Sequence, residues 1–278
     1  MERRDFLKTA CTTGTVAAFA AGTMAQTSQS ANAAESSDGR TLIEFREYLC
    51  QTPEKKKKLI DILDSAMIPA LNRQGIKPVG IFETSAELNP GERTYNEANN
   101  LKVYLLCQYT SCEQMVGATA KLLADKTYMS DAAEIFSAPM RDPIYDSCES
   151  TIMRGFEHCP QIEVPNLEKD RVIQIRFYNS YNIERNAAKI EMFDTGGELE
   201  LFRKFNMLPV FFGETLAGRM MPNLTYMLSF KNEEERSKAW PQFGSSPEWK
   251  ELSGNSKYKD TANKIVNIVL KPSPKSQI

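Results

Sequence analysis

The sequence predicts an α+β protein in which one βαββαβ unit occurs twice in tandem. Three segment pairs repeat along the chain, namely residues 43–48 and 173–178, 77–83 and 208–214, and 103–106 and 225–228. The three pairs keep the same order, which is typical of a duplicated unit. Strand and helix patterns also alternate in the same succession in both copies. These observations predict two related domains in one chain.

The first copy begins with an alternating strand pattern at residues 41–49. Thr52 and Pro53 then predict the start of a helix over residues 54–72, because its apolar residues recur at helical spacing. Gly75 is expected to end that helix. The remaining predicted elements are strands at 78–82 and 101–109, a polar loop at 85–100, a helix at 112–135 and a closing strand at 146–157.

The second copy repeats this order. Its predicted elements are a strand at 172–178, a helical region at 184–206 interrupted near Gly196 and Gly197, strands at 208–214 and 224–230, helical segments at 233–243 and 247–252, and a strand at 262–270. The predicted domains are residues 40–158 and 170–272. A linker at 159–169 contains Pro160 and Pro165, and residues 273–278 are expected to be a frayed tail.

Each copy has the element order of a ferredoxin-like fold, so the prediction is two tandem ferredoxin-like domains. Such a fold has an antiparallel sheet with helices on one face. The other face is apolar here and needs a cover, which a second copy can supply. We therefore expect two sheets that face each other as an α/β barrel, either within one chain or between chains that self-associate.

The first residues resemble an export signal. Arg3 and Arg4 precede Phe6, Leu7 and Lys8, which is a twin-arginine pattern, and a weakly apolar stretch follows. We expect residues 1–33 to be a leader, cleaved after Ala33 or, as the second choice, after Ala25. The predicted location is therefore periplasmic or otherwise extracytoplasmic. The rest of the sequence has no apolar run of membrane length, so no membrane contact is expected after the leader is removed.

The charge argues against nucleic acid as a partner. The formal net charge of the 278 residues is −2, and removing a leader with three basic and two acidic residues makes it −3. A nucleic-acid-binding protein usually has a basic surface. The sequence favours a small-molecule ligand instead.

The cysteines suggest one disulfide. Five cysteines follow the leader, and neither a CxxC nor a zinc-finger spacing occurs among them. In a ferredoxin-like fold the end of the first strand lies beside the start of the fourth. Cys50 and Cys148 are therefore a disulfide candidate, if their Cα atoms lie within about 7 Å.

The sequence predicts neither a metal site nor a cofactor. Its one histidine, His158, lies next to the linker, and histidine is the commonest metal ligand and a frequent general base. The glycines follow no phosphate-binding motif. Catalysis by a Ser-His-Asp triad or by a histidine-bound haem would therefore depend on a linker residue.

Arginine and tyrosine supply the remaining candidates for ligand binding. Arg176 and Tyr178 lie two residues apart on one predicted strand and share a face, as do Arg46 and Tyr48. Inside a barrel such a pair could bind a carboxylate or an enolate, because the guanidinium forks onto planar anions. The alternative is a structural arginine paired with a nearby carboxylate. Glu214 ends a strand and could act as an acid or base, or as a salt-bridge partner.

A resemblance to a known family favours the second copy as the place of the binding site. The sequence 44–48 approximates Glu-x-Arg-x-Tyr, and the run 208–214, Gly218, 222–227, Trp240 and 247–250 resembles the NIPSNAP family of the dimeric α/β-barrel superfamily. The resemblance spans about residues 40–271 and is most specific in the second copy. It implies the fold and no established reaction. The candidate ligand-binding residues are Arg176, Tyr178, Glu214, Tyr226 and Trp240, with Arg46 and Tyr48 from the first copy.

Three functions stay open from the sequence. The favoured one is binding of a small, partly apolar ligand in an α/β-barrel pocket, with no assigned reaction. The second is cofactor-independent enolisation or oxygenation of a small organic acid, in which Tyr178 or Glu214 takes a proton and Arg176 holds the anion. The third is a non-catalytic assembly module, in which the arginine and tyrosine are structural and Trp240 is a core residue.

Overall fold

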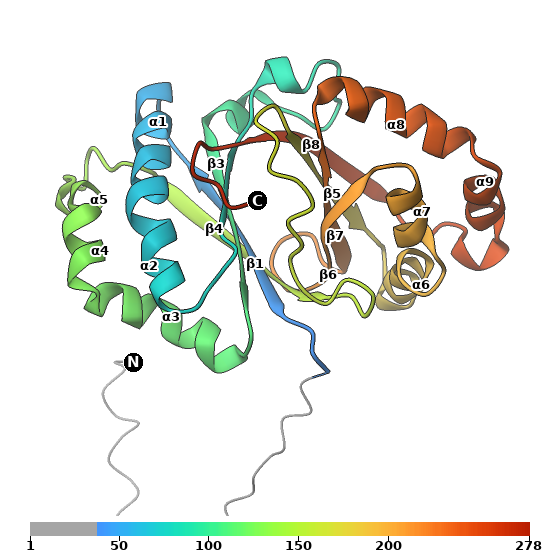
Figure 1. Cartoon of the computed structure of the whole chain (residues 1–278), viewed down its shortest axis with the longest axis horizontal. Helices are drawn as coiled ribbons and strands as arrows, with labels where there is room; N and C mark the ends of the chain where they lie inside the picture. The colour runs from blue at the N-terminus through green and yellow to red at the C-terminus, as the bar shows by residue number, and fades with distance from the viewer. Residues whose placement is uncertain (1–37) are drawn as a thin grey trace, which may run out of the picture. The chain divides into compact units, whose positions relative to one another are not determined.

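Eight antiparallel strands close into a barrel in the computed structural model, which describes residues 38–278 (Figure 1). The strands are β1 (Leu42–Leu49), β2 (Gly80–Glu83), β3 (Lys102–Tyr109), β4 (Ser147–Gly155), β5 (Val172–Asn179), β6 (Leu208–Ala217), β7 (Asn223–Phe230) and β8 (Lys264–Pro272). Their order around the barrel is β1-β3-β2-β8-β5-β7-β6-β4. The predicted leader, with its twin-arginine pattern and cleavage sites, lies outside the described residues.

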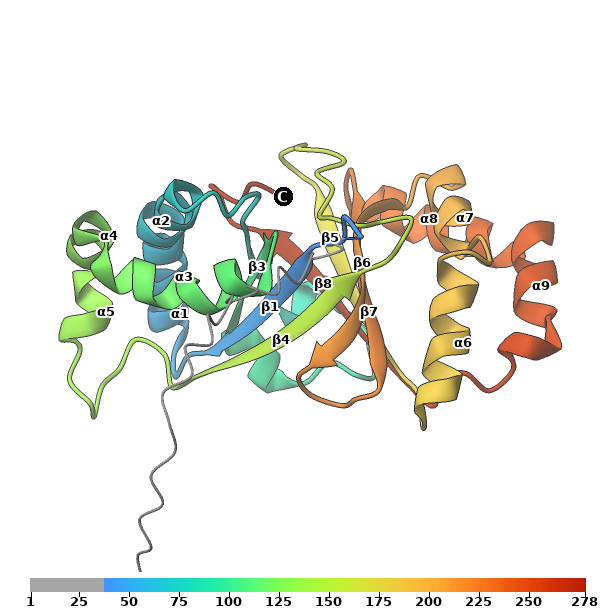
Figure 2. The same ribbon diagram turned by 90° about the horizontal axis from the view of Figure 1, so that it is seen from below.

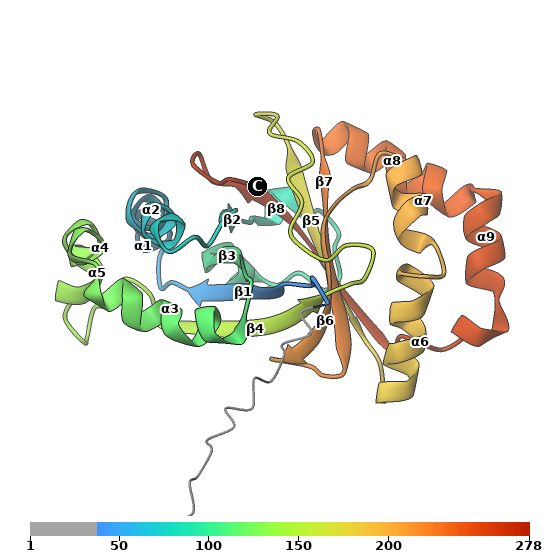
Figure 3. The same cartoon turned by 60° about the horizontal axis from the view of Figure 1, so that its bottom comes forward.

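The helices lie outside the barrel, one group on each side (Figure 3). The first half contributes α1 (Pro53–Ile62), α2 (Ile68–Arg73), α3 (Cys112–Ala124), α4 (Lys126–Asp131) and α5 (Ala133–Ser137). The second half contributes α6 (Ile183–Phe193), α7 (Glu198–Lys204), α8 (Glu233–Ser245) and α9 (Pro247–Gly254). The predicted order of strands and helices is found in both halves.

The first predicted helix is real but contains a π-helical turn, Leu63–Met67, between α1 and α2. Thr52 caps its start by accepting a hydrogen bond from the backbone N–H of Lys55 at 3.3 Å. Pro69 follows the π-helical turn and has no N–H to donate. We attribute the wider turn to this proline, because a π-bulge accommodates a missing helical hydrogen bond.

Within each half the strands pair with one another, and two seams join the halves. Within the first half β1 pairs with β3 and β4, and within the second half β5 pairs with β7 and β8. The seams are β4 with β6 and β2 with β8. The barrel therefore closes within the chain, which decides between the two arrangements expected from the sequence.

The barrel interior is an apolar core to which both halves contribute. Its fully buried residues include Ile43, Phe45, Tyr104, Leu106, Met153, Ile173, Ile175, Phe211, Met227 and Leu270. Two further apolar clusters lie between the sheet and the helices, one in each half. The strands lie between the two groups of helices (Figure 2), so the apolar core forms three layers with the shared one in the middle.

The seam between β2 and β8 is short. The two strands share two residue pairs, Phe82 with Pro272 and Glu83 with Lys271. Along the rest of the edge that faces β2, the backbone of β8 contacts side chains of the 85–100 loop. The second half has no corresponding loop.

Two polar side chains of that loop take the place of a neighbouring strand. Asn89 accepts a hydrogen bond from Val269 N at 2.7 Å and donates to Val269 O at 3.1 Å. Thr94 Oγ1 accepts from Asn267 N at 3.1 Å. The loop therefore satisfies backbone groups that an open sheet edge would leave unpaired.

Residues 273–278 are docked, so the expectation of a frayed tail is wrong. Ser273 N donates to Ile81 O at 2.8 Å, and Gln277 N donates to Val79 O at 3.0 Å. The side chain of Ile278 is 1% exposed and packs into the barrel interior. Burial of this apolar side chain and pairing with the backbone beside β2 explain why the segment is held.

The expected disulfide between Cys50 and Cys148 is not formed, and both residues are free cysteines. The β1–β4 register pairs Cys148 with Tyr48, two residues before Cys50. Cys50 instead lies beyond the strand end and is buried among apolar residues, whereas Cys148 is exposed. The predicted strand neighbourhood is correct, and the register separates the two thiols.

Candidate functional site

Arg176 and Tyr178 lie on β5 and face the helices of the second half. The alternate residues Ile173, Ile175 and Phe177 pack in the barrel interior instead. Because successive side chains on a strand point to opposite faces, Arg176 and Tyr178 share a face, as expected. The expectation that this face lines the inside of the barrel is wrong, since the apolar residues occupy those positions.

Aromatic rings surround the Arg176 guanidinium. Its central carbon lies 4.4 Å from the ring centre of Trp240, on α8, and 5.3 Å from that of Tyr178. Tyr226 is opposite Arg176 in the β5–β7 register, and its hydroxyl lies 3.4 Å from that of Tyr178. Four of the predicted candidates are therefore brought together. Cation–π contacts stabilise the charge but give its N–H groups no acceptor.

Two ionisable residues that were not selected from the sequence complete this cluster. Lys189 of α6 and Glu198 of α7 lie 3.8 Å apart, and Glu198 is 2% exposed. Burial raises the pKa of Glu198 to about 7, although the charges of Lys189 and Arg176 oppose the rise. Burial also lowers the pKa of Lys189. An acid in the first turn of a helix is common, so the sequence contains no signal for this role.

The corresponding arginine of the first half has a carboxylate partner. The Nε and Nη2 atoms of Arg46 each donate to the carboxylate of Glu44 at 2.8 Å. The hydroxyls of Tyr109 and Ser150 donate to the same carboxylate at 2.5 and 2.6 Å. Burial raises the pKa of Glu44, but these donors outweigh it and leave the pKa lowered. Arg46 and Glu44 therefore form a structural ion pair. Tyr48 packs against a neighbouring tyrosine ring at 5.1 Å.

Arg176 lacks the partner that Arg46 has. Gln174 stands where the first half has Glu44, and its amide is used elsewhere: Trp240 Nε1 donates to its oxygen, and its nitrogen donates to Asn267, both at 2.6 Å. Within residues 38–278, Arg176 Nε is buried and has no hydrogen-bond partner. A buried donor without an acceptor costs about 1–3 kcal/mol, and more when it is charged.

A small cleft lies next to this arginine. Asn267 is opposite Arg176 in the β5–β8 register, and it lines a cleft of about 160 Å³ between the 85–100 loop and α8. Glu92 enters the cleft from the loop and accepts a hydrogen bond from Asn267 at 2.7 Å. Burial raises the pKa of Glu92, but hydrogen bonds from Asn267 and Thr94 and the charge of Arg176 leave it lowered. Arg176 thus makes this region favourable for a negative charge.

Glu214 does not join the cluster. It is opposite Leu224 on β7 and Arg154 on β4, and it lines a separate surface pocket of about 390 Å³ beside α6. Leu224 separates it from Tyr178 across the sheet. Glu214 therefore does not converge with Arg176 and Tyr178, an arrangement that would favour the enzymatic function.

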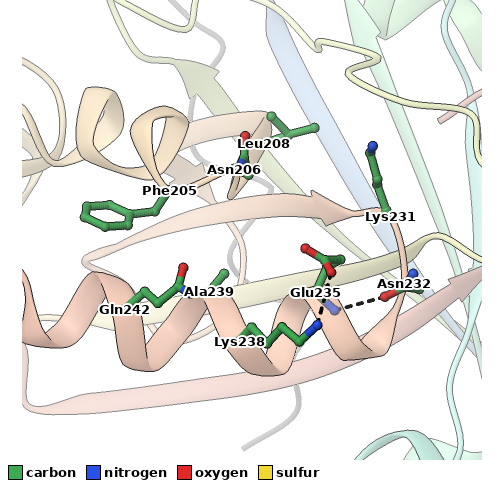
Figure 4. Close-up of a pocket in the computed structure, with 9 residues that line it drawn as sticks. All are labelled: Phe205, Asn206, Leu208, Lys231, Asn232, Glu235, Lys238, Ala239 and Gln242. Carbon is green, nitrogen blue, oxygen red and sulfur yellow. Dashed lines mark hydrogen bonds and ion pairs between the residues drawn. The ribbon is translucent and has the colours of Figure 1, made fainter.

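A larger hollow of about 430 Å³ lies at the start of α8, away from the candidate residues (Figure 4). Two contacts join polar groups that line it. Asn232 accepts from the backbone N–H of Glu235 at 2.9 Å, and Lys238 lies 3.6 Å from the Glu235 carboxylate. These contacts are those of a capped helix start, and we assign no ligand to them.

No metal site is found in the described part of the chain. Within residues 38–278 there is no group of three or more histidine, cysteine, aspartate or glutamate residues that could hold an ion. His158 is exposed and contacts Asp194, which raises its pKa. Among the described helices, none is long and apolar enough to cross a membrane.

The geometry defines an α/β-barrel protein with a buried, incompletely paired arginine in its second half. Residues 173–277, which contain that arginine, match the NIPSNAP family, so the second half carries a NIPSNAP family domain. A search of the curated proteins gives no match to this sequence.

Solved structures share the fold at low sequence identity. A protein from Lactobacillus acidophilus, described provisionally as a monooxygenase, is 8% identical with a TM-score of 0.56, and the match covers 84% of this chain and 94% of that one. A similarly described protein from Fusobacterium nucleatum is 10% identical with a TM-score of 0.54, covering 84% and 92%. An uncharacterised NIPSNAP-like domain protein from Burkholderia xenovorans is 14% identical with a TM-score of 0.36, covering 40% and 92%. For the two structures with TM-scores above 0.5, the likeness concerns the fold alone.

Proposed function

We propose that the chain binds a small, planar organic anion between the sheet and helices of its second half, with Arg176 as the anion's partner. The observation that carries this proposal is the missing carboxylate: Arg46 has Glu44, whereas Arg176 has the neutral Gln174. A bound carboxylate supplies the two parallel acceptors that a guanidinium prefers. Trp240 and Tyr178 favour a ligand with an apolar, preferably aromatic body.

The proposal includes no reaction. A reaction at the anion would need a base or acid in contact with it. Glu214, the sequence-based candidate, is separated from Arg176 and Tyr178. Glu198 is the acid of this cluster, and its contact is with Lys189 at 3.8 Å. The monooxygenase description belongs to the structural relatives, and at their low sequence identity it does not extend to this chain. Binding is therefore the function that the described residues support best.

A titration with benzoate tests the proposal. We expect saturable binding to the full chain by isothermal titration calorimetry. Gln174→Glu places a carboxylate beside Arg176, as Glu44 lies beside Arg46, and should weaken benzoate binding at least tenfold, because a charged hydrogen-bonded partner is displaced. Gln242→Glu is the matched control, since it adds the same charge to the exposed side of α8 and should leave the affinity unchanged.

The outcomes separate binding from a purely structural arginine. Benzoate affinity that is equal in the wild type and in Gln174→Glu would contradict the proposal. Native mass spectrometry of the protein purified from its own host should also retain a small acid, and that acid should be lost in Gln174→Glu. A retained acid would identify the natural ligand class.

We further propose that the chain is exported by the twin-arginine route and that its two halves derive from one duplicated ferredoxin-like unit. The paired Arg3 and Arg4 support export, and the repeated segments with the same strand order in each half support duplication. Arg3→Lys with Arg4→Lys should leave the protein in the cytoplasmic fraction. Export of the double variant at the wild-type level would contradict the first proposal.

A further inference from the structure

The barrel interior is hollow at one end. A cavity of about 190 Å³ opens where β1, β3, β5 and β8 reach this end, and both halves line it. The first half contributes mainly polar groups, including Glu47 and Lys102. The second half contributes an apolar surface from Phe177, Val266 and Ile268. This cavity lies on the opposite face of β5 from Arg176, so it is distinct from the site described above.

Polar residues at this end overlie an apolar layer of the barrel. Glu47 and Lys102 are inward-facing residues at the ends of β1 and β3, joined by an ion pair of 2.8 Å. One pleat deeper, Phe45 and Tyr104 stack at 5.4 Å, and Phe45 lies 6.2 Å from the Phe177 ring. A ligand entering here meets charged groups first and aromatic rings below them.

Tyr104 has a buried hydroxyl without a partner. Its side chain is fully buried, it is opposite Glu47 in the β1–β3 register, and within residues 38–278 its hydroxyl makes no hydrogen bond. Burial raises the pKa of Tyr104 well above its usual range, so the group is a neutral donor. An unpaired buried hydroxyl is a cost that a phenylalanine would avoid. A bound acceptor would remove that cost.

The charge balance of the cavity favours an anion. Lys102 is paired with Glu47, and Arg219 at the rim is paired with Glu149 at 2.6 Å. Lys264 also lines the cavity, is exposed, and has no ion-pair partner among residues 38–278. One uncompensated positive charge therefore remains at the entrance, which attracts a ligand with a single negative charge.

We propose that this end of the barrel is a second binding site, which takes a small monoanion with an apolar body. The apolar body packs on Phe177, Val266 and Ile268, and the carboxylate lies between Lys264 and the Tyr104 hydroxyl, which donates a hydrogen bond to it. Residues of both halves hold the ligand, so the site depends on closure of the barrel within one chain.

The test uses 4-bromobenzoate, whose bromine can be located directly. Crystals of the full chain soaked with the compound should show anomalous bromine density in the barrel end, separate from any density beside Arg176. Calorimetry should show that Tyr104→Phe weakens binding at this site about tenfold or more, the usual effect of losing a hydrogen bond to a charged group. Lys264→Ala should weaken it in the same direction.

Melting temperatures distinguish the loss of a ligand contact from a defect in folding. Tyr104→Phe should leave the melting temperature equal or higher, because it removes an unpaired hydroxyl and no cavity is made. Tyr109→Phe is the matched control: its hydroxyl donates to Glu44 at 2.5 Å, so the variant should melt lower and bind 4-bromobenzoate as the wild type does. Absence of bromine at the barrel end, unchanged affinity in Tyr104→Phe, or a melting temperature lowered as in Tyr109→Phe would overturn the proposal.

Discussion

At the scale of single residues, the largest difference between the halves is that Glu44 of the first half corresponds to Gln174 of the second. Glu44 neutralises Arg46 and receives two further hydroxyl hydrogen bonds, whereas Gln174 leaves Arg176 with a buried, unpaired Nε. The two corresponding arginines therefore differ: Arg46 is held in a buried ion pair, whereas Arg176 keeps a buried N–H without an acceptor.

Glu44→Gln should strongly destabilise the protein. Removing one member of a buried ion pair leaves the other charge uncompensated, which typically costs about 3–5 kcal/mol. Urea unfolding followed by circular dichroism would measure the loss. Glu149→Gln breaks an exposed pair with Arg219 and should change the free energy of unfolding by less than about 1 kcal/mol. Equal effects of the two variants would show that burial of the first pair is unimportant.

The buried acid predicts a pH dependence of stability. Glu198 keeps its proton in the folded state up to about pH 7, while its ordinary pKa is 4.5. The folded state therefore binds more protons between these values, and stability should fall as pH rises from about 5 to 7. Glu198→Gln stays neutral, so its stability relative to wild type should rise over that window by an amount on the order of 3 kcal/mol.

Urea unfolding at pH 5, 6, 7 and 8 would test this dependence. Glu251→Gln, on the exposed surface of α9, is the matched control and should follow the wild-type curve. A difference between Glu198→Gln and wild type that stays constant with pH would mean that Glu198 is ionised throughout.

Residue identities alone predicted part of this cluster. Arg176, Tyr178, Tyr226 and Trp240 were selected from the sequence, and the structure brings them together. The spacing of Arg176 and Tyr178 fixes that they share a face but leaves open which face, because that depends on how Ile173 and Ile175 pack. Glu198 and Lys189 approach through tertiary packing of α6 and α7, for which no local pattern exists.

At the scale of elements, the 85–100 loop acts as part of the sheet. Its sequence is that of a polar insertion, yet Asn89 and Thr94 hydrogen-bond the backbone of β8. An amide side chain carries a donor and an acceptor, so it can satisfy both groups of one strand residue.

Asn89→Ala should loosen β8 locally. The substitution leaves the backbone N–H of Val269 without its acceptor, which costs about 1–3 kcal/mol. Hydrogen exchange measured by mass spectrometry should show faster exchange in residues 264–272 than in β5. Glu87→Gln, an exposed position of the same loop, should leave exchange in β8 unchanged. Uniform acceleration over the whole barrel would instead indicate global destabilisation.

Most elements follow from periodicity and caps, and the exceptions have physical causes. The first helix was predicted as continuous, whereas Pro69 introduces a π-helical turn within it. Residues 273–278 contain one large apolar side chain, Ile278, which is too little for a periodic pattern. Their docking depends on β2 and on space in the barrel, neither of which is local.

At the scale of the whole molecule, the two halves share one apolar interior. A sequence cannot tell whether the bare face of a ferredoxin-like sheet meets its own second copy or another chain, because both covers bury the same residues. The two seams and the common core show that here the cover is the other half of the chain.

An isolated second half, residues 170–278, should not persist as a folded monomer. Without the first half it would expose Ile175, Phe211 and Met227, which are fully buried in the whole chain. Contiguous apolar surface of this kind drives association. Analytical ultracentrifugation should find dimers or larger species, with the full chain as the reference. A fragment that sediments as a monomer and unfolds cooperatively would contradict this expectation.

The short seam between β2 and β8 also affects how fast the chain can fold. It joins Phe82 to Pro272, whereas most other strand pairs lie within one half. Contacts so distant along the chain form slowly, because the loop between them must be ordered first. We therefore expect folding to pass through a species with both half-sheets formed and the barrel still open. In that species the edges of β2 and β8 are unpaired, and refolding at high protein concentration should lose material to aggregation at this step.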